Sequence, residues 1–243
     1  VLTAAALALL LLYGFTYTRK RRLAMHMQLM QLRLVNVRSR ISPHFIFNVL
    51  NNRISNARKG DADELMGLVR LIRANLNMSG RYYVSLKEEL DFVKYYASVE
   101  GNCVDGGLDF SVSAPADGVL EQVMVPSMSI QILVENAIKH GLKRREGRKR
   151  LCVAVAVEKA GCRITVTDNG TGFDIRRGDP SSTGTGLKVI RSTIGLINRY
   201  NKNKISLEIR NLRAADGSVE GCEVSITMPR GMRLPGLKGI ETN

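Results

Sequence analysis

Cysteine, histidine and aromatic residues are scarce in this chain of 243 residues, which has four cysteines, three histidines and no tryptophan. No C-x-x-C pair occurs among the cysteines, which are Cys103, Cys152, Cys162 and Cys222. This scattered spacing indicates neither a zinc site nor a disulfide framework. In a cytoplasmic setting we expect all four to be reduced thiols.

Acidic residues are missing from residues 1–60, a stretch that contains ten lysines and arginines. A second basic concentration, KRREGRKR, occupies 143–150, and outside these two segments the chain is nearly neutral although its formal net charge is +14. Such a charge usually suggests a nucleic-acid partner. Because no aromatic residues interleave either cluster, we expect no nucleic acid here. The first segment suits an anionic membrane leaflet, and the second suits a solvated loop.

The N-terminal stretch VLTAAALALLLLYGFTYT carries no charge and is followed directly by RKRR. As a helix, residues 1–18 would cover roughly 27 Å, close to the hydrocarbon thickness of a bilayer. A cleaved signal peptide would place its basic residues before the apolar run, and a buried core helix would not need them at all. We predict a transmembrane helix in the cell (inner) membrane, with the rest of the chain cytoplasmic. Since the chain begins with valine, we also expect an upstream sensor segment.

Residues 19–100 are predicted to form a helical dimerisation region. A heptad seam is made by Leu23, Met27, Met30, Leu34, Val37 and Ile41, and such a seam favours pairing with another helix. Pro43 interrupts it and would leave His44 outside regular packing. Further helices are expected at 63–78 and from Ser85, which forms a capping box with Glu88, to about Glu100. Because each helix has one apolar face, we expect a homodimer that closes a four-helix bundle.

The sequence after Gly101 alternates between apolar and polar residues. Strands are predicted at 108–114, 151–158, 162–168, 204–210 and 222–228, and helices at 127–140 and 186–200. We therefore expect a mixed sheet with helices on one face, an α/β sandwich over 101–230, followed by a loose tail over 231–243. The predicted fold class of the whole chain is α+β.

The segment ENAIKH places Asn136 and His140 four residues apart on one face of a predicted helix, with Glu135 and Lys139 beside them. A carboxamide oxygen is a suitable Mg²⁺ ligand, and a lysine can reach phosphate oxygens. Alone the pattern is weak, because polar residues on a helix commonly just face solvent.

Two glycine-containing motifs follow, DNGTGF at 168–173 and GTGL at 184–187. Asp168 closes a predicted strand and could accept a hydrogen bond from an amine such as that of adenine, while the glycines permit close backbone approach. Asp-Asn-Gly is equally typical of a hairpin turn. GTGL opens a helix whose free N–H groups could bind a phosphate, and the polar residues 173–183 between the motifs could form a lid. The order and spacing of the three motifs are what is specific.

SPHFIFNVLN, LVENAIKHG, DNGTGF and GTGLKVIRSTI resemble the phosphoacceptor, N, G1 and G2 boxes of bacterial sensor histidine kinases of the LytS type, over about residues 38–229. The resemblance implies a Bergerat (GHKL) ATP-binding domain, as in gyrase and the Hsp90 chaperone. It also implies roles for His44 as phosphoacceptor, Asn136 as Mg²⁺ ligand and Asp168 as adenine reader. The nucleotide-binding set it implies is completed by Lys139, His140, Gly170, Gly172, Gly184 and Gly186. The chain departs from the family pattern before Pro43, where asparagine is more usual.

These motifs predict a membrane-bound two-component kinase that phosphorylates its own histidine with ATP and passes the phosphoryl group to a response regulator. Neutral imidazole is a competent nucleophile near pH 7, although a lone histidine such as His26 is more often a packed residue. Phe45 stands where other histidine kinases often place a carboxylate, so the general base is unassigned and Glu135 is a candidate. Asn48, one turn beyond His44, could orient a water for phosphatase activity. Two alternatives are an ATP-driven conformational switch without kinase activity and a non-enzymatic basic scaffold at the membrane.

Overall fold

The computed structural model describes residues 9–19, 78, 81–101, 106–143, 145–173 and 185–234. The chain divides into two units, Val1–Asn48 and Val49–Asn243. The predicted heptad seam, the break at Pro43 and nearly all of helix 63–78 lie outside the described residues, as do His44 and Asn48.

In the first unit, residues 9–19 are helical and their large apolar side chains are exposed. The Thr16 and Thr18 hydroxyls donate to the carbonyls of Tyr13 and Phe15. Within the described parts of the chain, no helix is both long enough and apolar enough to cross a bilayer. The predicted membrane helix over 1–18 begins outside the described residues, so it stays a prediction.

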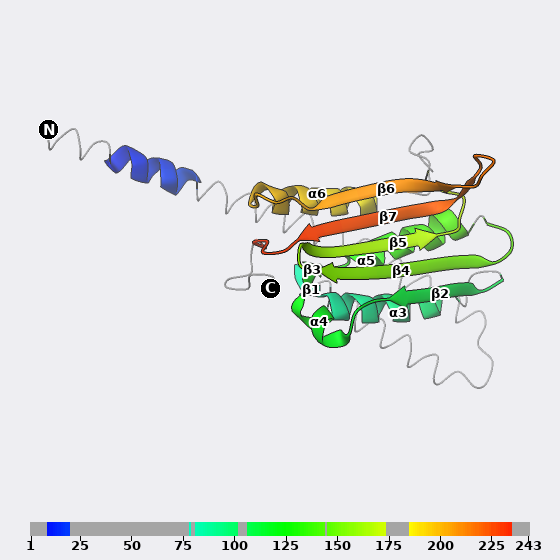
Figure 1. Ribbon diagram of the computed structural model, residues 1–243. Coiled ribbons are helices and arrows are strands. Elements are labelled where there is room, and N and C mark those ends of the chain that lie inside the picture. The colour runs from blue at the N-terminus through cyan, green and yellow to red at the C-terminus, as the bar shows by residue number, and fades with distance from the viewer. Residues whose placement is uncertain are drawn as a thin grey trace, which may run out of the picture. The chain divides into compact units, whose positions relative to one another are not determined.

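The second unit is an α/β sandwich (Figure 1). Its helices are α3 (Leu86–Gly101), α4 (Asp117–Gln122), α5 (Ser129–Asn136), the π-helix η1 (Ala137–Leu142) and α6 (Thr185–Arg199). Its strands are β1 (Tyr83–Ser85), β2 (Leu108–Ser113), β3 (Met124–Pro126), β4 (Lys149–Glu158), β5 (Gly161–Asp168), β6 (Ser206–Arg213) and β7 (Val219–Pro229).

The main sheet has the strand order β2-β4-β5-β7-β6. β2 pairs with β4 in parallel, and the other neighbours are antiparallel, so the sheet is mixed as predicted. All five predicted strands are present, with ends that differ from the prediction by a few residues at most. The sequence predicts these strands because each has one buried face and one more exposed face, so apolar and polar residues alternate along it.

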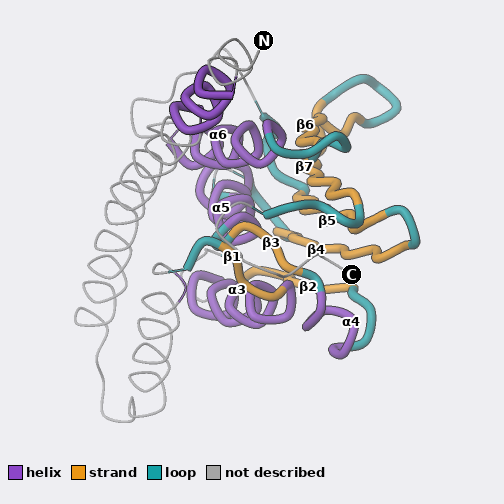
Figure 2. The backbone as a smooth tube through the Cα atoms, turned by 90° about the vertical axis from the view of Figure 1, so that its left-hand side faces the viewer, coloured by secondary structure: helices purple, strands orange, loops and turns teal. Residues whose placement is uncertain are grey.

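Helices α3, α5 and α6 cover one face of this sheet (Figure 2). On β5, Ile164 and Val166 are buried, whereas Arg163 between the helix-facing positions is exposed. The apolar core therefore lies between the sheet and the helices. Cys162 belongs to this core, and burial raises the pKa of its thiol to about 11. Cys152, Cys162 and Cys222 are free thiols, and Cys103 lies outside the described residues.

Three short elements were not predicted, namely β1, β3 and α4. β1 and β3 pair as a two-stranded antiparallel sheet, with Val84 opposite Val125. Strands of three residues are too short to show a period, so their pairing depends on contacts between distant segments. The predicted capping box at the start of α3 is confirmed: the Ser85 hydroxyl accepts from the Glu88 N–H at 3.2 Å, and Glu88 accepts from the Ser85 N–H at 2.9 Å.

The predicted helix at 127–140 is present as α5, but its second half is the π-helix η1. Its closing hydrogen bond runs from the Lys143 N–H to the Ile138 carbonyl, a span of five residues rather than four. π-helical turns are rare and occur frequently at functional sites. A π-helix has more residues per turn than an α-helix, yet Glu135 and Lys139, four positions apart, still form an ion pair across the junction of α5 and η1.

Candidate functional site

The turn that follows β5 is held by the neighbouring strand β4. The carboxamide of Asn169 accepts from the Arg150 N–H at 2.7 Å and donates to the Arg148 carbonyl at 3.0 Å. The backbone N–H of Asn169 also donates to the Arg150 carbonyl, at 3.2 Å. The DNGTGF segment is thus not a simple hairpin turn, because β5 leads into a loop fastened to β4.

The rest of this loop is fastened to two other elements. The Thr171 N–H donates to the Gly141 carbonyl of η1 at 3.1 Å. The carboxamide of Asn211, on β6, accepts from the Phe173 N–H at 2.7 Å and donates to the Phe173 carbonyl at 3.0 Å. The loop is consequently held in place by β4, η1 and β6 up to the residue where the predicted lid begins.

Asp168 lies at the end of β5 with its side chain buried. Its Oδ1 accepts from the Gly170 N–H at 2.8 Å. Burial raises the pKa of this carboxyl from 3.8 to about 6, while backbone N–H groups of Gly170 and Cys222 act in the opposite direction. A buried carboxyl that titrates near neutrality is characteristic of functional sites and costs stability when it is ionised.

Two glycines surround the Asp168 carboxyl with bare backbone. A Cβ atom on Gly141 would lie 2.8 Å from Asp168 Oδ1, and one on Gly170 would lie 2.3 Å from the Gly141 carbonyl carbon. Gly172 has a φ of +81°, a conformation that favours glycine. The π-helix and the DNGTGF loop can approach each other only because neither Gly141 nor Gly170 carries a side chain.

Glu135 and Lys139 form an ion pair, with Oε1 and Nζ 2.5 Å apart. Glu100, at the end of α3, belongs to the same group of charges. Burial raises the pKa of Glu100, and the nearby Glu135 adds to this effect, whereas Lys139 counteracts it. Lys139 therefore pairs with Glu135 and also interacts electrostatically with Glu100. Asn136 and His140 are half-buried in the same helical segment.

The second glycine motif lies beside the first helical motif. α6 begins at Thr185, one residue before the predicted start at 186. A Cβ atom on Gly186 would lie 2.7 Å from Ile132 Cγ2 and about 4 Å from the Asn136 carboxamide atoms. Gly186 and Asn136, fifty residues apart in sequence, are thus brought together. Gly184 and nearly all of the predicted lid fall outside the described residues.

This arrangement fits an adenine nucleotide. One end offers a buried carboxyl framed by glycine backbone, and the other offers the N-terminus of α6 beside a carboxamide. In the described part of the chain, no cluster of three His, Cys, Asp or Glu side chains could hold a metal ion. The carboxamide oxygen of Asn136 is of the type that could serve as a Mg²⁺ ligand.

Three residues with roles in this arrangement were not singled out from the sequence. Gly141 is the last residue of the LVENAIKHG motif, so a glycine at that point was the available signal. Asn169 sits inside DNGTGF, but its carboxamide bonds resemble those of any turn asparagine. Asn211 gave no local signal, because its partner Phe173 is 38 residues away.

The stability of the nucleotide-free protein is expected to depend on the ionisation of Asp168. Because the folded-state pKa is raised to about 6, the folded protein holds this proton more tightly than the unfolded chain does. The resulting stability is fully present below about pH 4 and is lost as the pH rises through about 6, by up to about 3 kcal/mol. Urea unfolding of the protein and its Asp168→Asn variant, compared from pH 4 to 8, isolates this effect. A stability difference between the two that is constant with pH would contradict it.

Replacing Gly141 with alanine is expected to weaken adenine-nucleotide binding by about tenfold. The new Cβ atom would lie too close to Asp168 Oδ1, so either the carboxyl or the π-helix has to move. Gly195→Ala on α6 is the matched control, because a Cβ atom there meets nothing within 4 Å. Calorimetric titration of both variants with ATP checks the prediction, and equal affinities would show that the close packing is not needed.

Comparison with known proteins gives two family matches. Residues 32–104 match the histidine kinase family, and residues 127–232 match the family described as histidine kinase-, DNA gyrase B- and HSP90-like ATPase. The second match contains β4, β5, α6, β6 and β7 together with the motifs of the candidate site. It covers the N-box residues, the DNGTGF loop and the start of α6.

Curated relatives with similar sequences are sensor proteins. "Sensor protein LytS" of Staphylococcus saprophyticus is 30% identical over 207 residues, which cover 80% of this chain and 33% of that protein. The protein of the same name from Bacillus subtilis is 28% identical over 79% of this chain and 33% of its own length. "Sensor histidine kinase/phosphatase LytS" of Staphylococcus aureus is 35% identical over 57% of this chain and 24% of its length. The chain thus spans at most about a third of these relatives.

Solved structures also match over much of the chain. The histidine kinase domain of the Erythrobacter litoralis EL346 blue-light activated histidine kinase covers 82% of this chain and 94% of its own, with 19% identity and a TM-score of 0.45. The mycobacterial sensor histidine kinase MprB covers 60% of this chain and 95% of its own, with a TM-score of 0.41.

Proposed function

Because the chain belongs to the sensor histidine kinases of the LytS type, we propose that it phosphorylates its own His44 with ATP and passes the phosphoryl group to a response regulator. The observation that carries the proposal is the convergence of three separate motifs: Gly141 lies against Asp168, and Gly186 lies beside Asn136. These contacts bring residues of all three motifs together around η1 and the end of α5. A basic scaffold without enzymatic activity would not need them.

Each residue of the site has a proposed role. Asp168 accepts a hydrogen bond from the adenine amine, and Gly170 and Gly172 let the loop approach the nucleotide. Gly184 and Gly186 bring the N-terminus of α6 to the phosphates, where the helix dipole favours negative charge. Lys139 and His140 flank the phosphate end. Asn136 would hold Mg²⁺, which would neutralise charge on the phosphate oxygens.

The transfer itself needs a nucleophile and a proton acceptor. The His44 imidazole attacks the γ-phosphorus, the bond to the bridging oxygen of ADP breaks, and the imidazole proton must leave. Glu135 is the candidate acceptor for this proton. In the structure Glu135 is paired with Lys139. Glu135 would accept the proton only when Lys139 leaves this ion pair and binds the phosphates.

The setting of the reaction is proposed as well. The apolar residues 1–18 followed by RKRR support an inner-membrane anchor with the kinase region in the cytoplasm. The heptad seam supports a homodimer, in which the four helices around His44 form one bundle. The proposed partner is the receiver domain of a response regulator, and no nucleic-acid partner is proposed.

Incubation with γ-labelled ATP tests this function. We expect a label on the protein that is lost in acid, because phosphohistidine is acid-labile, and that moves to an added regulator. Turnover of ATP without any label on the protein would instead support the alternative, a conformational switch of the GHKL type. If the protein acquires no label and turns over no ATP, only the scaffold role remains.

Asn48→Ala is expected to retain self-labelling but to slow dephosphorylation of a phosphorylated regulator several-fold. If the helix continues past Pro43, Asn48 lies one turn from His44 on the same face, where its carboxamide can orient an attacking water. The S. aureus relative is named as a kinase and phosphatase, which supports testing both activities. A parallel loss of labelling and dephosphorylation would mean that Asn48 only supports the position of His44.

A further inference from the structure

Helix α5, which leads to the nucleotide residues, begins without a cap of its own. Its N-cap residue, Met128, is left-handed with φ 67° and ψ 11°, and its side chain makes no capping hydrogen bond. Met128 is also the single non-glycine residue with positive φ among the residues described. The first turn of any helix leaves N–H groups that need partners, and here they are buried. Another part of the chain has to supply the acceptors.

Glu89, on the first turn of α3, supplies them. Its Oε2 accepts from the Met128 N–H at 2.9 Å, and its Oε1 accepts from the N–H groups of Ile130 at 2.9 Å and Gln131 at 3.2 Å. The Glu89 side chain is fully buried. A carboxylate is well suited to this position, because the helix dipole places partial positive charge at the N-terminus. One side chain therefore caps a helix that starts about forty residues later in the sequence.

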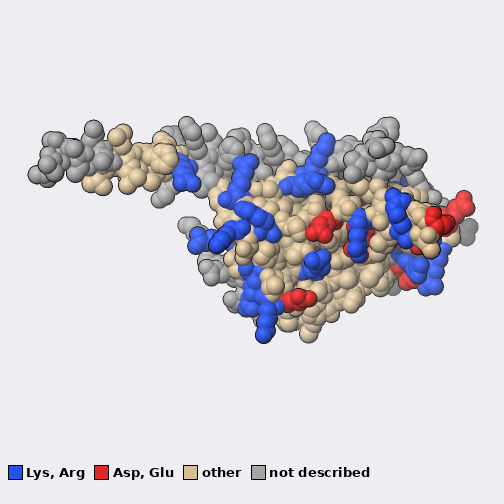
Figure 3. Space-filling model, turned by 45° about the horizontal axis from the view of Figure 1, so that its top comes forward, with Lys and Arg blue, Asp and Glu red and all other residues tan. Residues whose placement is uncertain are grey.

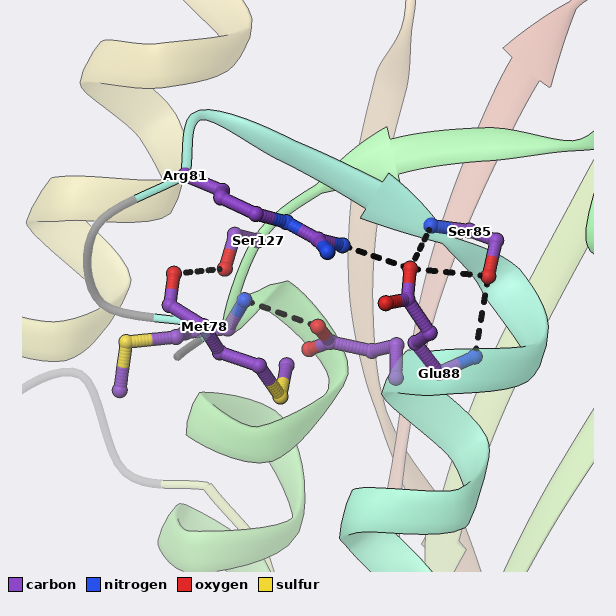
Figure 4. Close-up of polar contacts among 7 residues, drawn as sticks. Met78, Arg81, Ser85, Glu88 and Ser127 are labelled. Carbon is purple, nitrogen blue, oxygen red and sulfur yellow. Dashed lines mark hydrogen bonds and ion pairs between the residues drawn. The ribbon is translucent and has the colours of Figure 1, made fainter. Parts of the chain in front are cut away.

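The same corner of the fold receives the segment that precedes α3. The Ser127 hydroxyl donates to the Met78 carbonyl at 2.9 Å, and the Ser127 N–H donates to the Tyr82 carbonyl at 2.9 Å. Nearby, Glu88 closes the α3 capping box and pairs with Arg81 at 2.6 Å (Figure 4). Residues 127–131 are thus hydrogen-bonded to Met78, to Tyr82 and to Glu89 of α3.

The opposite end of α5 carries the residues proposed to act on the phosphates. Asn136 is eight residues from Met128, so it lies about 12 Å further along the helix axis. A shift of the first turn of α5 would move Asn136 with it, because a short helix behaves as a rigid rod. Asp168 is carried by the sheet, because its strand β5 is paired on both sides, with β4 and β7, although Gly141 of η1 also lies against its carboxyl.

We propose that Glu89 is a positioning residue for the phosphate end of the nucleotide site, because it locks the first turn of α5 onto α3 and thereby sets the place of Asn136. The inference rests on the proposed function. In this proposal the site has an adenine end, which the sheet carries, and a phosphate end. The position of the phosphate end depends on the contact between α3 and the first turn of α5. Movement of α3 would reach the phosphate end first.

The test compares two ligands in the protein that contains all 243 residues. Adenosine probes the adenine end alone, and Mg·ATP probes both ends. Glu89→Gln keeps the shape of the side chain but replaces one acceptor oxygen with a donor that faces N–H groups. We expect it to weaken Mg·ATP binding about tenfold or more while adenosine affinity changes less than about twofold. Glu89→Asp keeps the charge but is shorter, so its effect should lie between.

Glu88→Gln is the matched control, since Glu88 is the neighbouring residue but caps α3 rather than α5. It should leave the ratio of the two affinities unchanged. Parallel losses of adenosine and Mg·ATP affinity in Glu89→Gln would reduce Glu89 to a stability residue and overturn the proposal, as would no loss at all. If Glu89→Gln does not fold, the same contrast in Glu89→Asp decides. Failure of the unmodified protein to bind Mg·ATP would instead remove the proposed function, and the role of Glu89 with it.

Discussion

Replacing His44 with glutamine is expected to abolish self-labelling from γ-labelled ATP. Glutamine has a similar length and can hydrogen-bond, but its carboxamide nitrogen is not a nucleophile, so no phosphoryl group can be accepted. ATP affinity should stay nearly unchanged, because the residues proposed to bind the nucleotide lie at 135–186. The loss of labelling should therefore exceed any change in binding by several orders of magnitude.

His26→Gln serves as the control for this experiment. His26 has no motif around it and falls on the predicted heptad helix, so its replacement should leave labelling intact. Acid-lability assays on both variants separate histidine labelling from labelling of hydroxyl groups. Persistent acid-labile label on the His44→Gln protein would show that another residue accepts the phosphoryl group.

The second large effect is expected from Asp168→Asn, which should weaken ATP binding about tenfold or more. The substitution replaces an acceptor oxygen with an amide group that donates, so the adenine amine would face another donor. A buried polar group left without a partner costs about 1–3 kcal/mol. Adenosine affinity should fall by the same factor as ATP affinity, since the defect lies at the adenine end.

Nucleoside selectivity gives an independent check on Asp168. The unmodified protein should prefer ATP to GTP, because guanine presents a carbonyl oxygen where adenine presents its amine, and this oxygen would face the carboxylate. The Asp168→Asn variant should lose most of that preference. Equal ATP and GTP affinities in the unmodified protein would remove the adenine-reading role.

Asp168 also illustrates a conflict between stability and function. Above about pH 6 its buried carboxyl is ionised at a cost to the folded state, since burial has raised its pKa. Asp168→Asn is therefore expected to stabilise the nucleotide-free protein at pH 7 while impairing nucleotide binding. A gain in stability together with a loss of nucleotide affinity is the result expected for a group that serves binding rather than folding.

Much of the fold was predictable because its signals are local. The alternating strands β2, β4, β5, β6 and β7 and the capping box of Ser85 and Glu88 each depend on residues within one short stretch. Helix α5 was predicted as well, but its π-helical continuation was not. That change of hydrogen bonding accompanies the contact between Gly141 and Gly170, which are 29 residues apart.

The sequence by itself determined the mixed sheet with its helices, because apolar periodicity is a property of neighbouring residues. Its short motifs indicated the family and predicted the residues proposed to hold ATP. Tertiary structure alone decided how those residues meet. The carboxyl of Asp168 is framed by Gly141, the loop end at Phe173 is clamped by Asn211, and α5 is capped by Glu89. These contacts join segments roughly thirty to forty residues apart. No local pattern specifies them, since the partner of each polar group is chosen only when folding buries it beside a distant strand or helix.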